Sequence, residues 1–354
     1  MRKTIKRSFY NEIKKIVGKD RYLSTMEDRY CYSYDATRRS YVPDIVVFPR
    51  TAEQISNLVK LAGAEKISIY PRGAGTGFSG GSLPVTGGMV LVFTEMNRIH
   101  SISKNERVAL VEPGVVVGTL QSEVESEGLF YPPDPASGPF CTLGGNVAEN
   151  SGGPRAIKYG VTKDYVLGLE VVLPTGDVMT VGKLDKQHIN EWDLTSIFVG
   201  SEGTLGIITK ILLKLLRLPE YKATMRAVYE SIEKAAMSVS TIIASKILPS
   251  KLEFMDKLSI QCVEEYTHVG LPKGAEALLL IEVDGDRDVV EGEVKEIEKI
   301  CHQVGAIEFR KAQTQEEEER LWFARRSLSS ALSRVNNTKI NEDITVPRSK
   351  ISEI

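Results

Sequence analysis

The sequence lacks the patterns that would identify a metalloprotein or a nucleic-acid-binding protein. Its four cysteines form no C-x-x-C pair, which argues against a zinc ribbon or an iron–sulfur cluster. Its four histidines form no close pair, so no set of metal ligands is expected. Lysine and arginine total 45 against 47 aspartates and glutamates, and the net charge of −2 gives no overall field to attract nucleic acid or anionic lipid.

A hydrophobic run long enough to cross a bilayer is also missing. The most apolar central stretch, 207–218, is interrupted by Lys210, Lys214 and Arg217, whereas a spanning helix needs about 20 apolar residues. The basic N-terminus is followed by apolar residues at helical spacing and not by a continuous apolar segment, so no signal peptide is expected. We therefore expect a cytoplasmic protein with reduced, mostly buried thiols.

What is present is a globular composition in a long chain. The 354 residues are 42% hydrophobic and 26% charged, which predicts a folded protein of two domains. Glycine becomes sparse after Leu218-Pro219-Glu220, where long charged helices begin to alternate with single apolar strands. We expect an N-terminal helical segment over 1–40, a first domain over 41–219 and a second over 220–354.

Apolar periodicity predicts the elements of both domains. Thr51 and Gln54 have the spacing of a capping box, and a turn at 174–177 joins two strands in a hairpin. The alternation in the second domain indicates an antiparallel sheet with helices packed against it. The expected strands cover 45–48, 67–70, 89–93, 107–111, 166–173, 178–181, 207–216, 224–229, 252–255 and 277–283, and the expected helices start at 51 or cover 115–127, 232–245, 288–304 and 315–334.

The first of three glycine-rich segments follows the strand expected over 67–70. Residues 73–94 contain seven glycines and no charged side chain, so backbone N–H groups are the main polar surface, which suits a pyrophosphate. The motifs G-x-G-x-x-G and G-x-S-x-G both occur here, but each requires a helix that 83–88 cannot supply. No Gly-Lys-Ser/Thr follows, which excludes a P-loop. A glycine-rich connection without a ligand is the alternative.

Two further segments are rich in glycine. Residues 131–160 combine proline and glycine with neutral hydrogen-bonding side chains, and such a long loop either packs on the surface or wraps a ligand such as a flat polar heterocycle. Residues 199–209 form a glycine turn that leads into an apolar strand, and taken alone this segment is uninformative.

In this order and spacing, the three segments resemble the FAD-binding domain of the vanillyl-alcohol-oxidase (PCMH-type) superfamily, in its D-lactate dehydrogenase and glycolate oxidase large-subunit branch. The resemblance runs from about Tyr32 to the end of the chain. It implies an α+β fold: a PCMH-type FAD-binding domain of two α/β subdomains over 41–219, followed over 220–354 by an α+β cap domain with an antiparallel sheet, incomplete at its C-terminus.

The resemblance also implies FAD and its contacts. The Gly73–Gly81 loop would hold the pyrophosphate, and the segment 142–150 with Gly152 would lie along the flavin. Glu202, Ile207 and Ile208 would hold the ribose and adenine side. Thr76 occupies the place where some relatives have a flavin-linking histidine, so the implied FAD is non-covalent. The full implied set is Arg72, Gly73, Ala74, Gly75, Thr76, Gly77, Ser79, Gly80, Pro133, Asp134, Thr142, Gly144, Gly145, Asn146, Asn150, Gly152, Tyr159, Gly160, Glu202, Gly203, Gly206, Ile207 and Ile208.

The segment 321–326 in the last long helix resembles the family segment that binds the substrate carboxylate. The resemblance assigns this role to Arg325, whose planar guanidinium matches a carboxylate with two hydrogen bonds. The alternative is that Arg325 and Arg326 are ordinary surface cations. Glu342 and Asp343, in the family stretch that follows, are further candidates.

The family's usual base and metal ligands lie in a C-terminal His-x-Gly-Asp-Gly-Asn-x-His segment that this chain does not contain. The general base is therefore not expected in this chain, and no metal site is expected. An engineered truncation, a fragmentary gene record and a natural short form are all compatible with the end at Ile354. We expect a chain that binds FAD yet turns over poorly.

The implied reaction is FAD-dependent oxidation of a small 2-hydroxy acid, of the D-lactate or glycolate type, to the 2-oxo acid. Electrons would pass from the flavin to a partner, which could be an iron–sulfur or electron-transfer flavoprotein subunit, a quinone or a cytochrome. One alternative is a non-catalytic FAD-binding electron-transfer subunit. The other is the same flavin fold acting on a sugar lactone, an alkyl-glycerone phosphate or an enolpyruvyl sugar nucleotide.

Overall fold

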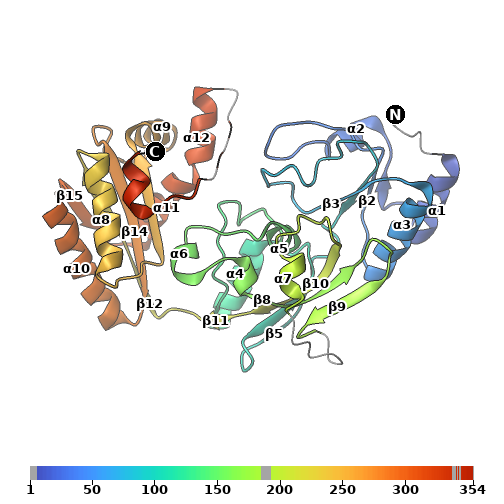
Figure 1. Ribbon diagram of the computed structural model, residues 1–354, viewed down its shortest axis with the longest axis horizontal. Helices are drawn as coiled ribbons and strands as arrows, with labels where there is room; N and C mark the ends of the chain where they lie inside the picture. Colours follow the sequence, from blue (N-terminus) through green and yellow to red (C-terminus); the bar gives the residue numbers. More distant parts are fainter. Residues whose placement is uncertain (1–5, 185–192, 337–339, 341, 343, 354) are drawn as a thin grey trace. The chain divides into compact units, whose positions relative to one another are not determined.

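The computed structural model describes residues 6–184, 193–336, 340, 342 and 344–353 (Figure 1). The chain forms two compact units. Unit 1 comprises Met1–Gly152 and Val161–Leu218, and unit 2 comprises Gly153–Gly160 and Pro219–Ile354. Unit 2 thus includes the last residues of the glycine-rich stretch 131–160.

The first sheet of unit 1 is mainly parallel and has the order β1-β2-β4-β3. The strands β2 and β3 both pair in parallel with β4, whose four residues are all buried. Parallel neighbours need a crossover, and α3 (Ala52–Glu65) supplies it between β2 and β3. The strands are β1 (Tyr22–Leu23), β2 (Ile45–Val47), β3 (Ile69–Arg72) and β4 (Met89–Val92).

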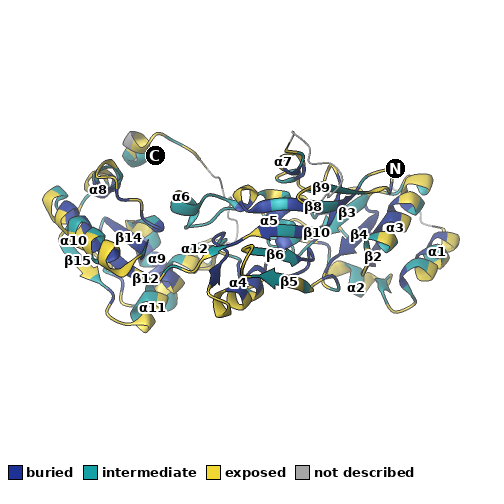
Figure 2. Ribbon diagram, turned by 90° about the horizontal axis from the view of Figure 1, so that it is seen from below, coloured by how far each residue is buried: buried dark blue, intermediate teal, exposed yellow. Residues whose placement is uncertain are grey.

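The start of α3 has one hydrogen bond of the predicted capping box, and the second is made by the residue before the cap. The Thr51 hydroxyl oxygen accepts from the Gln54 N–H (3.2 Å), and the Gln54 side-chain oxygen accepts from the Arg50 N–H (2.8 Å). These bonds satisfy backbone donors that have no partner within the helix. The helix has a buried face that includes Ile55 and Leu58. Figure 2 shows buried and exposed residues alternating along α3.

The second sheet of unit 1 is antiparallel, with the order β5-β6-β10-β8-β9. The expected hairpin is confirmed, because β8 and β9 pair antiparallel across the turn. Two short strands, β7 and β11, pair separately. The strands are β5 (Ile99–Ser103), β6 (Val108–Val111), β7 (Leu129–Phe130), β8 (Val166–Val172), β9 (Val178–Gly182), β10 (Ile207–Lys214) and β11 (Leu216–Arg217).

The segment that we expected to wrap a ligand as a loop contains a helix. Residues Leu143–Glu149 form α5, so the assignment of 142–150 to loop is wrong. Two glycines lower helix propensity in this stretch, and tertiary contacts described below hold the helix in spite of them. The other helices of unit 1 are α1 (Arg7–Val17), α2 (Met26–Tyr30), α4 (Val117–Ser126), α7 (Thr195–Phe198) and η1 (Thr162–Asp164).

Unit 2 has a four-stranded antiparallel sheet with the order β13-β14-β12-β15, which confirms the predicted antiparallel sheet. The central strand β14 is buried over eight of its nine residues. The strands are β12 (Tyr221–Tyr229), β13 (Lys251–Asp256), β14 (Ala277–Gly285) and β15 (Glu308–Lys311), and the helices are α6 (Ala156–Tyr159), α8 (Ile232–Ala244), α9 (Lys257–Thr267), α10 (Arg287–Val304), α11 (Gln315–Arg326), α12 (Leu328–Val335) and η2 (Arg348–Glu353).

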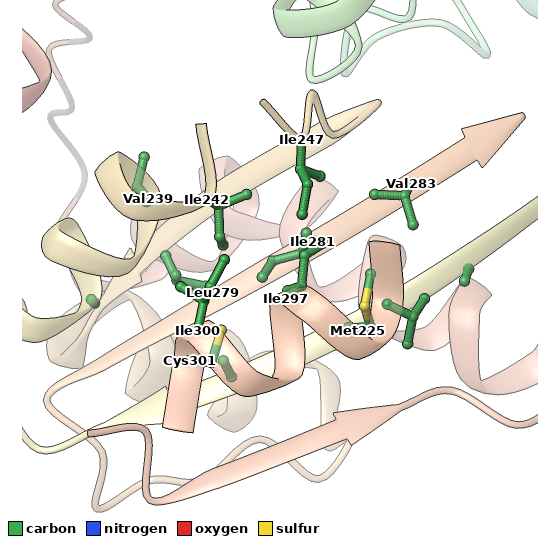
Figure 3. Close-up of a cluster of buried hydrophobic side chains, with 14 of the residues drawn as sticks. Met225, Val239, Ile242, Ile247, Leu279, Ile281, Val283, Ile297, Ile300 and Cys301 are labelled. Carbon is green, nitrogen blue, oxygen red and sulfur yellow. The ribbon is translucent and has the colours of Figure 1, made fainter. Parts of the chain in front are cut away.

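Alternate residues of β14 enter two different cores. Leu279 and Ile281 pack against α8 and α10, where Ile242 and Ile297 are fully buried (Figure 3). The residues between them, including Leu280, pack on the other face against α9 and α11. Successive side chains of a strand point to opposite faces, and both faces of β14 are covered by helices. Its sequence is therefore almost continuously apolar.

One expected helix is divided in the structure. The predicted helix over 315–334 consists of α11 and α12, which separate at Ser327. The Ser327 N–H donates to the carbonyls of Phe323 and Ala324, which closes the last turn of α11. Serine favours helix ends because its side chain competes with the backbone for hydrogen bonds. Among the helices that the structure describes, none is long and apolar enough to cross a membrane.

Candidate functional site

The Gly73–Gly81 loop begins directly at the end of β3. No helix lies between β3 and β4, so the structure confirms that the two glycine motifs are neither a Rossmann fingerprint nor a nucleophile elbow. Gly75 adopts a positive φ of 69°, and a side chain there would overlap the guanidinium of Arg72. Arg72 is itself buried (6% exposed) and supplies a positive charge at the base of the loop. Burial lowers the pKa of Arg72.

The helix α5 is positioned by the chain just before α4. The N–H of Leu143 donates to the carbonyl of Val115 (2.9 Å), and the N–H of Gly144 donates to that of Pro113 (2.8 Å). A Cβ at position 144 would lie 2.6 Å from the Pro113 ring, so only glycine permits this approach. The close contact explains why a glycine-rich sequence forms a helix here.

All three glycine-rich segments meet at α5. At its start, Gly73 lies so close to Thr142 that an added Cβ would overlap the threonine hydroxyl. At its end, the Ser79 hydroxyl donates to the Glu149 carboxylate (2.8 Å). The third segment joins there too, since the Glu202 N–H donates to the carbonyl of Ala148 (2.8 Å). Segments more than 50 residues apart in the sequence therefore form one local site within unit 1.

Two buried side chains of this site have a polar atom for which the described part of the chain offers no hydrogen-bond partner, Thr142 Oγ1 and Asn146 Nδ2. Thr142 is 5% exposed and Asn146 is 2% exposed. Thr142 is the N-cap of α5, yet its side chain accepts no hydrogen bond from the helix. Because buried polar groups in native proteins are nearly always paired, both atoms fit a ligand that brings its own polar groups.

The Gly73–Gly81 loop itself is uncharged, and the charged groups of the site lie at its ends, with Arg72 at the base and Glu149 at the edge. Burial raises the pKa of Glu149, at the edge of the loop, and the nearby charges of Glu202 and Asp35 raise it further. The hydrogen bond from Ser79 acts in the opposite direction and lowers this pKa.

Other residues of the predicted cofactor set are divided between the two units. Ile207 and Ile208 are buried at the start of β10, and the carbonyl of Pro133 accepts from the Gln121 side chain (2.9 Å). Tyr159 belongs to unit 2, where its hydroxyl donates to the Asp284 carboxylate (2.8 Å). Gly160 is also in unit 2, whereas Asn150 ends α5 in the left-handed conformation (φ 52°).

Arg325 is partly exposed and forms an ion pair within unit 2. It lies on α11 with 31% of its side chain exposed, and its Nε donates to Glu253 on β13 (2.6 Å). One turn earlier, Trp322 is buried and donates to the Thr224 hydroxyl (3.2 Å). Arg326 is exposed.

The structure gives little information on Glu342 and Asp343, the other two candidate site residues. Glu342 is exposed. Asp343 lies outside the described residues.

Neutral side chains and backbone amides gathered around one helix form a site suited to a dinucleotide, and the surrounding fold is not the Rossmann fold. Residues 43–182 match the family described as FAD binding domain, and residues 218–354 match the C-terminal domain of FAD linked oxidases. The chain belongs to this family of FAD-linked oxidoreductases, and its cofactor is FAD.

The similar proteins agree with this assignment. A "Glycolate oxidase subunit GlcD" of Bacillus subtilis (strain 168) is 47% identical over 340 residues, which cover 96% of this chain and 72% of that protein. A "D-lactate dehydrogenase" of Anaerostipes hadrus is 34% identical over 319 residues, covering 88% and 67%. The crystal structure of p-cresol methylhydroxylase with substrate bound has the same fold at 19% identity, with a TM-score of 0.76 over 92% of this chain and 70% of that one. The predicted PCMH-type α+β fold is confirmed.

Proposed function

We propose that this chain oxidises a small 2-hydroxy acid, of the D-lactate or glycolate type, to the 2-oxo acid, with non-covalently bound FAD. The relatives described as a glycolate oxidase subunit and a D-lactate dehydrogenase support this substrate class. The observation that carries the proposal is the pairing of Arg325 with Glu253, because an ion pair with a partly buried carboxylate, 16% exposed, restricts the orientation of the guanidinium.

In this proposal Arg325 binds the substrate carboxylate. Its Nε is engaged by Glu253, and the two terminal nitrogens form the fork that matches two carboxylate oxygens. FAD, once bound, accepts the α-hydrogen of the acid with its electron pair. We assign no residue of this chain as the base for the hydroxyl proton.

The proposal includes an electron-accepting partner in the cytoplasm. An iron–sulfur or electron-transfer flavoprotein subunit, a quinone or a cytochrome would take the electrons from the flavin. NAD is not proposed, because the G-x-G-x-x-G segment has no helix after it.

The test is the visible spectrum of the FAD-loaded chain under anaerobic conditions. Addition of D-lactate, and separately of glycolate, should bleach the flavin absorption. Propionate has the carboxylate but no 2-hydroxyl group, so it should leave the spectrum unchanged. A chain that binds FAD and is bleached by dithionite, but by neither hydroxy acid, would contradict the proposed reaction.

Two alternatives predict that last outcome. A non-catalytic electron-transfer subunit would be reduced only by its partner protein. A different substrate, such as a sugar lactone, an alkyl-glycerone phosphate or an enolpyruvyl sugar nucleotide, would bleach the flavin where the hydroxy acids do not. Arg325 favours a carboxylate substrate over the lactone.

A further inference from the structure

A carboxyl group lies against the glycine loop that we expect to hold the pyrophosphate of FAD. The Glu149 carboxylate accepts a hydrogen bond from the Ser79 hydroxyl (2.8 Å). The same oxygen, Oε1, lies 3.6 Å from a Cβ added at Gly77 and 3.8 Å from one added at Gly81. It therefore borders the loop along 77–81. Glu149 is not among the residues that the resemblance assigns to the cofactor, so its place here requires an explanation of its own.

A bound ligand can reach this carboxyl group, because the Glu149 side chain is exposed. Other atoms of the site point to a ligand independently of Glu149. Thr142 Oγ1 and Asn146 Nδ2, at the start and in the middle of α5, are buried and lack a hydrogen-bond partner among the residues that the structure describes. The Thr142 hydroxyl adjoins the loop, since a Cβ added at Gly73 would overlap it.

The surroundings disfavour a negative charge on Glu149. Burial raises its pKa most, and the charges of Glu202 and Asp35 raise it further, against the hydrogen bond from Ser79. Glu149 is also the last residue of α5, where the unpaired carbonyls of the helix carry partial negative charge. The positive charge of the loop is Arg72 at its base, and this buried guanidinium itself lies in the field of Asp35.

FAD would bring two more negative charges, because its pyrophosphate is a diester that stays ionised near neutral pH. Backbone N–H groups of the loop suit this group, and a phosphate oxygen held at 77–81 lies beside the Glu149 carboxyl. Two negative charges in contact repel each other strongly once the ligand has displaced the water between them. A protonated carboxyl removes this repulsion, and its O–H is a hydrogen-bond donor.

We propose that Glu149 is a further FAD contact and that it binds the cofactor as the neutral carboxylic acid, donating a hydrogen bond to a phosphate oxygen. The proton comes from solvent, so the binding of FAD takes up a proton at this residue. FAD affinity is then highest at low pH, falls as the pH rises above the pKa of Glu149 in the free protein, and levels off above its higher pKa in the complex. The proposal requires only the cofactor of the family and not the 2-hydroxy-acid substrate.

The experiment compares Glu149→Gln with the wild type in the full chain. Glutamine has the shape of the neutral acid, and its side-chain oxygen can still accept from Ser79. The dissociation constant (Kd) is measured by flavin fluorescence on titration of the FAD-depleted protein between about pH 5 and 8, where we expect the wild-type Kd to rise about tenfold, which corresponds to a difference of about one pKa unit between the free and the bound protein. The matched control is Glu125→Gln, at an exposed position of α4, and it should follow the wild type.

Glu149→Gln should keep its Kd constant within about threefold and bind about ten times more tightly than the wild type at about pH 8. Calorimetric titration in two buffers of different ionisation enthalpy counts the protons, and the wild type should take up more than Glu149→Gln. Two results would overturn the proposal. One is the same pH dependence of Kd in Glu149→Gln and the wild type. The other is weaker binding by Glu149→Gln at every pH, which would identify the ionised carboxylate as the binding form. A wild-type chain that binds no FAD would overturn the proposal together with the cofactor assignment.

Discussion

At the scale of single residues, the site around α5 depends on glycines at which a side chain would overlap a neighbouring residue. Gly73 is the clearest of these, because an added Cβ would overlap the hydroxyl oxygen of Thr142. That hydroxyl is buried and unpaired, and we place it against the cofactor. A change at position 73 therefore displaces a cofactor contact before it disturbs the core.

We expect Gly73→Ala to weaken FAD binding at least about tenfold, roughly the effect of one lost hydrogen bond plus a displaced loop. Titration of the FAD-depleted chain with FAD measures this. The matched control is Gly63→Ala, since Gly63 lies in α3 with no atom within 4 Å of an added Cβ. That variant should keep its FAD affinity and gain up to about 1 kcal/mol of stability. Equal affinities for both variants would refute the close contact at Thr142.

The sequence predicts the glycine loop but not the unpaired atoms. The absence of charge in 73–94 is visible in composition, so the loop's suitability for a pyrophosphate follows from residue type alone. Whether a hydroxyl is buried and unpaired depends on contacts between distant segments. Thr142 shows this, because it is the N-cap of a helix as Thr51 is, but only the Thr51 hydroxyl accepts a hydrogen bond from its helix.

At the scale of elements, α11 meets β13 through two pairs of side chains. Lys251 lies over the ring of Trp322, 4.3 Å from its centroid, and Glu253 binds Arg325. The strand residues are two apart and the helix residues three apart, so each pair of neighbours shares a face. Lys251 and Trp322 are both buried, and Lys251 Nζ also binds the Glu282 carboxylate (3.0 Å).

Arg325→Lys keeps the charge but loses the fork, so the acid concentration for half-reduction of the flavin should rise at least about tenfold. The measurement is anaerobic titration with D-lactate or glycolate, whichever bleaches the flavin. Arg326→Lys is the matched control, because Arg326 is exposed beside it, and its titration should equal the wild type. If Arg325→Lys also reaches half-reduction at the wild-type concentration, Arg325 does not bind the carboxylate.

The elements themselves were predictable where burial follows a simple period. Strands with several buried apolar residues, such as β4, β8 and β14, and the buried face of α3 follow from apolar spacing, and the cap of α3 follows from Thr51. The short strand β1 and the mostly exposed or half-buried β5 did not follow. The helix α5 did not follow, because its glycines fit against Pro113 and that contact is not local. The break at Ser327 was missed because apolar residues continue at helical spacing on both sides of it.

At the scale of the whole molecule, the two units have separate hydrophobic cores. One gathers around α3 and the parallel sheet, and the other lies between β14 and the helices α8 and α10. The polar groups assigned to FAD near α5 all belong to unit 1. Binding of FAD should therefore stabilise unit 1 directly.

Calorimetry of the full chain should show two unfolding transitions. FAD should raise the midpoint temperature of one of them, the unfolding of unit 1. At an FAD concentration about 100 times its dissociation constant, the stabilisation should be about 2.7 kcal/mol. Leu279→Ala, in the core of unit 2, should lower the other transition, by about 2–5 kcal/mol of stability. A single transition that responds to both changes would show that the units unfold together.

The segment Gly153–Gly160 limits how this protein can be dissected. It leaves unit 1 and returns to it, yet Lys158 and Tyr159 both bind the Asp284 carboxylate, which is only 7% exposed. Unit 2 is therefore a discontinuous domain, although almost all of it follows Pro219. A gene fragment that starts at Pro219 would leave a buried carboxylate without these two donors, so no single cut in the sequence yields both halves intact.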